Sequence, residues 1–384
     1  MSAPVRNGEP PARENVVPTG PAAPIERITT QFVSVPLEQP IRHPFLGSRT
    51  KFATLLVQVH TADGCTGFGY ASIESVRLVS ALNEIIRDLA NGLVGLDALR
   101  HEFIWERMYN LTVDVLHDGA ANLAMTAIDV ALWDILGKRT GLPVWKLVGG
   151  FRDQVPAYAS WTLWRHMTNS QLQSEAAEIV RLGFRAMKLR LGGGRSLAED
   201  VERAALVRAT VGPEVSIMVD ALWGLSATEG VRMARALGEL NYAWLEEPVR
   251  EGDFVGLSRV RDVQALPIAG GERISRVAGV AALLPCVDHV ILDAHHLGGI
   301  TPWLKAAAMV ENANLPISAH SHPAVHAHLL AGKRTGAWIE YMPWWNVLFI
   351  EPQIPRDGML HMTSKPGLGL DLDLNAVARY AVSA

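Results

Sequence analysis

Eight short apolar segments, separated by longer segments with helical spacing, recur between residues 155 and 342, and this repeat restricts the possible folds more than any other feature. Repeated strand–helix units of this kind form a parallel sheet, and eight of them in about 190 residues predict a closed barrel. The active site of such a barrel lies at the C-terminal ends of its strands. The predicted strands are residues 157–161, 187–191, 216–221, 243–246, 268–271, 289–294, 316–320 and 337–342.

The chain before this repeat has a different pattern. Helical spacing of leucine and alanine runs from residue 75 to about 141. It follows three segments with the alternating or clustered apolar residues of strands, joined in part by a tight Gly-containing turn. The fold class predicted for residues 26–150 is therefore α+β, with an antiparallel meander preceding a helical layer. The three predicted strands are residues 28–35, 52–60 and 67–70.

Composition excludes several classes of protein. A net charge of −4 without a run of lysine or arginine argues against nucleic acid as a partner. Cys65 and Cys286 belong to no CxxC pattern, which predicts neither a disulfide framework nor a zinc site and favours the cytoplasm. Residues 1–25 lack the apolar core of a signal peptide, so we interpret them as a disordered leader. No uninterrupted apolar run reaches the roughly 20 residues that span a bilayer, so we expect no membrane partner.

Three acidic residues end consecutive predicted strands. Asp220, Glu246 and Glu272 follow one another at intervals of 26 residues, about the length of one strand–helix unit, so they return to the same rim. Three oxygen ligands of this kind suit Mg²⁺ better than zinc. Glu247 points the opposite way from Glu246 in an extended strand, and we exclude it from the metal site.

Two cations share one face of the second barrel strand. Lys188 and Arg190 are two residues apart, so both side chains enter the barrel while Leu189 between them faces the helices. Fixed cations at this position can bind and polarise a carboxylate. We therefore predict that both residues belong to the active site.

A carboxylate and an imidazole end the sixth and seventh strands. Asp293 can fix the tautomer of His320 and raise its basicity, which predicts a general base. The proton alpha to a carboxylate is a weak acid, so the enediolate that forms needs stabilisation by the metal and Lys188, and by Glu340 as a protonated hydrogen-bond donor. Packing or solvent roles are assigned to three further histidines: His322, His326 and His328.

In this order the motifs resemble the mandelate racemase and muconate-lactonizing family of the enolase superfamily. The resemblance covers nearly the whole chain after the leader and implies an α+β capping domain (26–150) over a modified (β/α)7β barrel (151–349). It also implies that residues 350–384 return to the capping domain. The motifs are AIDVALWDILGKRTGLPVWKLVGG (127–150), GFRAMKLR (183–190), IMVDA (217–221), WLEEP (244–248), GGER (270–273), LDAHHLGGIT (292–301), ISAH (317–320), WIE (338–340) and PGLGLDLD (366–373).

The resemblance also implies residue roles. Lys188 matches the family's carboxylate-binding lysine, and Glu340 matches the hydrogen-bonding acid of mandelate racemase. The matching metal ligands are Asp220, Glu246 and Glu272, and the matching dyad is Asp293 with His320.

Two positions depart from the family pattern. Many members carry K-x-K, whose second lysine is a base on the face opposite the histidine, whereas this chain has Arg190, which seldom releases its proton. Leu222 stands where asparagine is common, so part of the pocket is expected to be apolar.

Arg190 favours a dehydratase, because racemisation needs a base on each face whereas elimination of water can use His320 alone. We predict that a 2,3-hydroxylated sugar acid loses water and becomes a 2-keto-3-deoxy acid. The alternatives are a mandelate racemase-like racemase, epimerase or cycloisomerase that acts on a small 2-hydroxy carboxylic acid through the same intermediate, and a non-catalytic barrel that binds metal and acid. By resemblance we also expect a homo-oligomer.

Overall fold

The computed structural model describes residues 23–43, 47–73, 78–114, 118–192 and 194–382. Most of the predicted leader lies outside these residues. The prediction that the disordered leader extends to residue 25 is wrong for its last three residues. Ala23 is fully buried, and Pro24 forms a β-bridge with Asp97. Ile25 then begins the first strand. The capping domain therefore starts within the segment that the sequence assigned to the leader.

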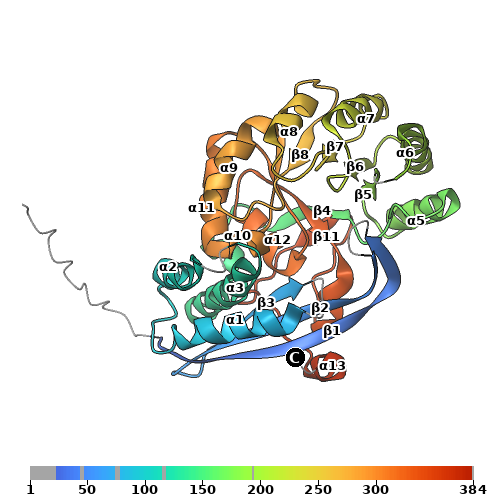
Figure 1. The fold of residues 1–384 in the computed structure, drawn as a ribbon. Helices are drawn as coiled ribbons and strands as arrows, with labels where there is room; N and C mark the ends of the chain where they lie inside the picture. The colour runs from blue at the N-terminus through green and yellow to red at the C-terminus, as the bar shows by residue number, and fades with distance from the viewer. Residues whose placement is uncertain (1–22, 44–46, 74–77, 115–117, 193, 383–384) are drawn as a thin grey trace, which may run out of the picture.

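The capping domain is an antiparallel sheet covered by helices (Figure 1). Its strands pair in chain order, as the alternating pattern predicted. The elements are β1 (Ile25–His43), β2 (Gly47–Thr61), β3 (Thr66–Ile73), α1 (Val79–Asn91), α2 (His101–Thr112), α3 (Ala120–Thr140) and α4 (Val144–Leu147).

Helix α3 is the central element between the two domains. By length and composition it could cross a membrane, but most of its residues are buried inside the protein. It packs against β3 so closely that a Cβ atom on Gly69 would lie 2.0 Å from the backbone oxygen of Ala127. Its apolar composition is therefore explained by contacts with protein on several sides.

Eight parallel strands form a closed barrel, as the repeat predicted. They pair in chain order from β4 to β11, and β11 pairs with β4 to close the sheet. The strands are β4 (Gln154–Ala159), β5 (Ala186–Arg190), β6 (Ser216–Asp220), β7 (Trp244–Glu246), β8 (Ile268–Gly270), β9 (His289–Leu292), β10 (Ile317–Ala319) and β11 (Gly336–Tyr341).

Helices surround the barrel and return the chain to the next strand. Three consecutive helices, α5, α6 and α7, begin with a capping box, which satisfies backbone N–H groups directly after the loops that leave the strand ends. The helices are α5 (Asn169–Arg181), α6 (Leu197–Val211), α7 (Ala227–Glu239), α8 (Phe254–Arg261), α9 (Val277–Leu283), α10 (Ala294–Leu297), α11 (Ile300–Asn312) and α12 (Pro323–Ala331).

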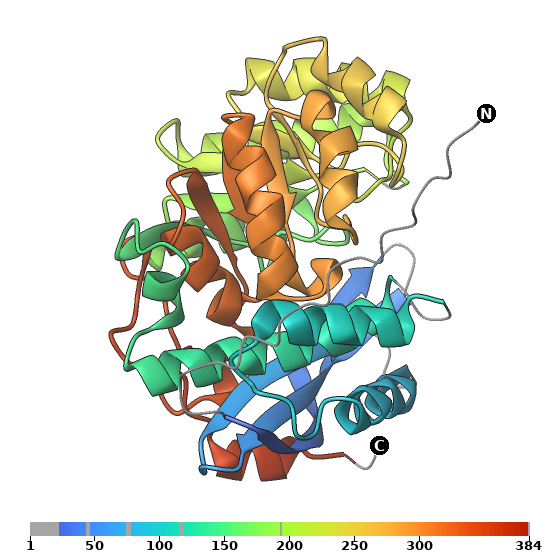
Figure 2. The ribbon, with the colours of Figure 1, turned by 90° about the vertical axis from the view of Figure 1, so that its left-hand side faces the viewer.

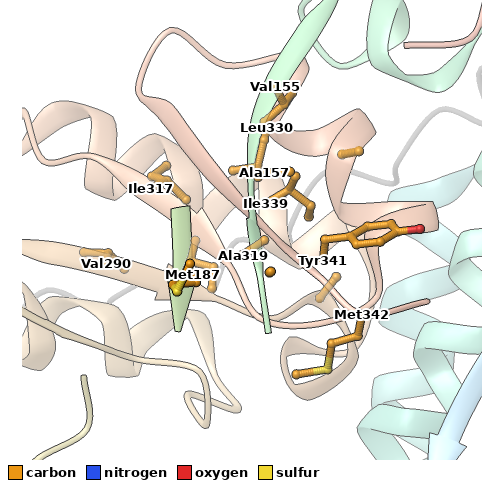
Figure 3. Close-up of a cluster of buried hydrophobic side chains, with 14 of the residues drawn as sticks. Val155, Ala157, Met187, Val290, Ile317, Ala319, Leu330, Ile339, Tyr341 and Met342 are labelled. Atoms are coloured by element: carbon orange, nitrogen blue, oxygen red, sulfur yellow. The ribbon is translucent and has the colours of Figure 1, made fainter. Parts of the chain in front are cut away.

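Strand residues alternate between two cores. Side chains such as Met187 and Ile339 belong to the layer between the barrel and its helices, part of which is shown in Figure 3. Tyr158, Met218 and Trp244 belong to a separate cluster formed by residues of the successive strands β4 to β9. This alternation places polar side chains of the same strands inside the barrel mouth.

The C-terminal segment joins both domains. Strand β12 (Met359–His361) pairs antiparallel with β4, and helix α13 (Leu374–Tyr380) lies against β1. The indole N–H of Trp345 reaches Thr54 and Ser72 of the cap at 3.1 and 2.9 Å. Figure 2 shows the cap stacked against one end of the barrel.

Buried neutral histidines make stability depend on pH. Trp145 N–H donates to His328 Nδ1 at 3.1 Å, His328 Nε2 donates to the Leu368 carbonyl at 3.2 Å, and burial lowers the His328 pKa from 6.5 to about 4. The unfolded chain therefore takes up a proton first as the pH falls. This contribution to the unfolding free energy is complete above pH 6.5 and declines between pH 6.5 and 4.

We expect His328→Asn to flatten the pH dependence of unfolding while retaining an acceptor for Trp145. The titration of one such histidine changes the unfolding free energy by about 3 kcal/mol between pH 6.5 and 4. Urea unfolding curves at pH 4 to 8 would measure this, with exposed His361→Asn as the control. An unchanged pH dependence in His328→Asn would contradict the assignment.

Candidate active site

The three acidic residues predicted as metal ligands converge at one rim of the barrel. Asp220 and Glu246 are the last residues of β6 and β7 and pair in register, and Glu272 follows the end of β8 by two residues. All three are at least 96% buried. Three buried acids at the ends of consecutive strands thus place their carboxylates on the same rim of the barrel.

The carboxylates disfavour one another's charge. Burial is the largest effect on Glu272 and raises its pKa to about 8. Repulsion from Asp220 and Glu246 also raises this pKa, while the nearby His320 lowers it. Burial also raises the pKa of Glu246, with Lys188 opposing the effect and Asp220 adding to it. A cation removes this cost, and hard oxygen donors with room for water and substrate fit Mg²⁺. The residues therefore suit the predicted ion, and their roles as ligands stay a prediction.

Both oxygens of Glu246 are held by other side chains. Lys188 Nζ donates to Oε1 at 2.8 Å, and the indole N–H of Trp244 donates to Oε2 at 2.9 Å. The Trp244 contact is not among the sequence predictions. The spacing of two residues within one strand was the available signal, because it places Trp244 and Glu246 on the same face.

A chain of polar contacts connects the predicted cations with Glu340. Lys188 Nζ lies 2.6 Å from Glu340 Oε1, and Ser160 Oγ donates to the same oxygen at 2.5 Å. Arg190 Nη2 donates to Ser160 Oγ at 2.8 Å, and its guanidinium carbon lies 3.7 Å from the centre of the Trp164 ring. Ser160 and Trp164 therefore fix Arg190 inside the barrel mouth, away from solvent.

The predicted protonated state of Glu340 is wrong for this arrangement. Burial raises the pKa of its carboxyl, but Lys188, His320 and Arg190 more than offset this effect and lower the pKa to about 2. Its Oε2 accepts the backbone N–H of Ser321 at 2.8 Å. Glu340 is therefore a carboxylate that orients Lys188. It forms an ion pair with Lys188 and does not act as the protonated hydrogen-bond donor that the sequence predicted.

Asp293 and His320 form the expected hydrogen-bonded pair. His320 Nδ1 lies 2.7 Å from Asp293 Oδ2, so Nε2 faces the metal-binding rim, 3.8 Å from Glu272 Oε2. Burial lowers the pKa of His320, but Glu272, Asp293 and Glu340 outweigh it and raise the pKa to about 10. Burial also opposes ionisation of Asp293, yet hydrogen bonds from His295 and His320 hold its pKa well below its ordinary value.

The remaining residues considered in the sequence lie outside this constellation. Glu247 accepts hydrogen bonds from Gly271 N–H at 2.7 Å and from the Trp223 indole at 3.0 Å, so both its oxygens are engaged away from the metal-binding set. His326 Nε2 accepts the Ala294 N–H at 2.9 Å and its Nδ1 contacts the Ser321 carbonyl. Buried packing positions are occupied by His322, His326 and His328.

Comparisons with known proteins agree with this architecture. Residues 27–149 match the model described as the mandelate racemase / muconate lactonizing enzyme N-terminal domain, and residues 171–377 match the enolase C-terminal domain-like model. A 3,6-anhydro-alpha-L-galactonate cycloisomerase from Streptomyces coelicolor is 31% identical over 93% of this chain and 99% of its own length. An L-talarate/galactarate dehydratase from Salmonella typhimurium is 30% identical over 85% of this chain and 82% of its own.

Solved structures give the same result. L-Talarate dehydratase from Polaromonas sp. JS666, complexed with Mg and L-glucarate, has a TM-score of 0.89 at 30% identity, covering 94% of this chain and 98% of that one. Fold and site together define an enzyme of the enolase superfamily. Within it, the chain belongs to the mandelate racemase / muconate lactonizing enzyme family, which confirms the resemblance seen in the motifs.

We expect Trp244→Phe to weaken Mg²⁺ binding roughly 10-fold to 100-fold, because Glu246 loses the donor that orients its second oxygen. Isothermal titration calorimetry with MgCl₂ would measure the change. Trp303→Phe is the matched control, since Trp303 is also fully buried and its indole N–H has no hydrogen-bond partner among the described residues. Equal Mg²⁺ affinity in both variants would contradict the positioning role.

Proposed function

We propose that this protein is a Mg²⁺-dependent dehydratase of 2,3-hydroxylated sugar acids, with Asp220, Glu246 and Glu272 as the metal ligands. The observation that carries the proposal is the asymmetry of the mouth. His320 is held as a base by Asp293, while the position facing it from β5 is Arg190, fixed by Ser160. Talarate/galactarate, arabinonate and rhamnonate dehydratases among the relatives support the same reaction class.

The first step is removal of the alpha proton. Neutral His320 would accept it at Nε2, since Nδ1 is committed to Asp293, and Mg²⁺ held by Glu272 would oppose the negative charge that raises the His320 pKa. Bound Mg²⁺ supplies Lewis-acid polarisation of the substrate carboxylate and lowers the repulsion among its ligands. Lys188 and Arg190 hold fixed positive charge beside the developing negative charge, and Glu340 keeps the Lys188 ammonium in place.

The second step is departure of the 3-hydroxyl group. Protonated His320 is the acid beside the substrate, so the proton taken from C2 returns on the leaving water. Asp293 stabilises the imidazolium between the two steps. The enol product becomes the 2-keto-3-deoxy acid, and no second base is required.

A second candidate is a racemase, epimerase or cycloisomerase. It is favoured by the cycloisomerases and the N-succinyl-L-Arg/Lys racemase among the relatives. These reactions share the first step and differ in where a proton is delivered. A non-catalytic barrel is disfavoured, because burying the charged groups Lys188, Asp293 and Glu340 is costly without use.

We also propose that the enzyme works in the cytoplasm as a homo-oligomer. Cys65 and Cys286 are free thiols, which suits a reducing compartment. Ile350, Ile354 and Leu374 of the C-terminal segment expose apolar surface of the kind that subunit contacts cover. Light scattering of the purified protein would give the assembly state.

The first test is turnover of stereoisomeric sugar acids with Mg²⁺ in deuterated water, followed by NMR. We expect a 2-keto-3-deoxy product from at least one acid. His320→Asn should abolish it, and Asp293→Asn should reduce kcat by roughly 10³-fold or more because the imidazole loses its orientation. Both variants should retain Mg²⁺ binding. Exchange of the alpha proton without any keto acid would transfer the assignment to the racemase class.

Arg190→Lys tests the asymmetry directly. A lysine can release its proton where an arginine cannot, so we expect deuterium to enter C2 from both faces while dehydration becomes slower. Arg235→Lys, on the exposed face of α7, is the control and should leave both rates unchanged. If wild-type protein already inverts C2, Arg190 serves as a base and the dehydratase proposal fails.

A further inference from the structure

Arg165 is a partly buried cation that the proposed mechanism does not use. It lies in the loop between β4 and α5, and its Nη2 donates to the Ala221 carbonyl at 2.5 Å. Its Nε and Nη1 atoms are buried and have no hydrogen-bond partner within the described part of the chain. Leaving such donors unmatched is costly, so a partner that enters the site would be bound strongly.

The position of Arg165 connects it to the metal-binding rim. Ala221 directly follows the ligand Asp220, so the guanidinium group is anchored one residue from the metal site. Arg190 and Asp220 are among the charged groups that act on it. Asp200, the other acid that acts on it, already accepts the Gly192 N–H at 2.7 Å.

A histidine and two further arginines lie near the same loop. His166, the next residue, has a buried Nδ1 atom without a partner among the described residues. Charges on Arg42 of the cap and Arg203 of α6 act on this imidazole. Arg203 itself donates only to neutral acceptors, including the Arg165 carbonyl at 3.3 Å. Positive charge therefore gathers where strand β1 of the cap approaches the β4–α5 loop.

We infer that Arg165 forms a subsite for a second carboxylate, so that the substrate is a sugar diacid. The inference rests on the proposed function, because it assigns the first carboxylate to Lys188 and the metal. Arginine hydrogen bonds to carboxylates are charge-assisted and about twice as strong as neutral ones. A monoacid, which ends in a hydroxymethyl group, leaves the same guanidinium without an anion.

The test compares stereoisomeric hexaric acids with the matching hexonic acids, which differ only at C6. Binding is measured by calorimetry with Mg²⁺ on His320→Asn protein, which does not turn the acids over. We expect at least one diacid to bind about 30-fold more tightly than its monoacid, and Arg165→Gln in the same background to remove most of that preference. Arg235→Gln on exposed α7 is the control, and Arg165→Lys should restore part of the preference.

The outcomes separate this inference from the proposed function. Equal binding of diacids and monoacids, no binding of any diacid, or an equal loss for both in Arg165→Gln would overturn the subsite. Arg165-dependent preference for a diacid, without keto product from the wild-type enzyme, would retain the subsite and reject the dehydratase. Circular dichroism of each variant shows whether a loss of binding reflects unfolding, and Arg165→Lys then provides the comparison.

Discussion

Mutual repulsion of buried carboxylates is the constraint on which the active end of the barrel depends. Asp220, Glu246 and Glu272 are brought together on consecutive strands, and each raises the cost of ionising another. Lys188 offsets part of this cost by contacting both Glu246 and Glu340. Its position in the middle of β5 makes it the internal counter-ion of the site, while the remaining negative charge is left for a divalent cation.

The capping domain contributes to the same site through buried hydrogen bonds from α3. Asn122 donates to the carbonyls of Ser275 and His296 at 2.8 and 2.7 Å. One side chain thus connects the loop after Glu272 with helix α10, which follows Asp293. Further along α3, Thr126 donates to the Ala294 carbonyl, and Asp129 accepts from Thr301. The relative positions of Glu272 and the Asp293–His320 pair are therefore set partly by residues of the other domain.

The sequence was sufficient to predict the barrel and the residue types at its mouth. The interval of about 25 residues returns each strand end to the same rim, so Asp220, Glu246 and His320 could be placed together before any coordinates. Contacts between side chains of strands distant in the sequence could not be predicted in this way. Ser160 shows no motif, yet it joins Arg190 to Glu340 across the β4–β11 closure, and the resulting ion pair keeps Glu340 ionised.

The same network explains why the mouth favours chemistry on one face. The strand of His320, β10, is separated from the strand of Arg190, β5, only by β11 and β4, which supply Glu340 and Ser160. Glu340 and Ser160 connect Arg190 with the backbone N–H of Ser321, the residue next to His320. A lysine there would have fewer fixed contacts and could approach a substrate carbon, whereas arginine stacked on Trp164 remains an electrostatic group. The proposed one-base mechanism therefore depends on the identity of residue 190.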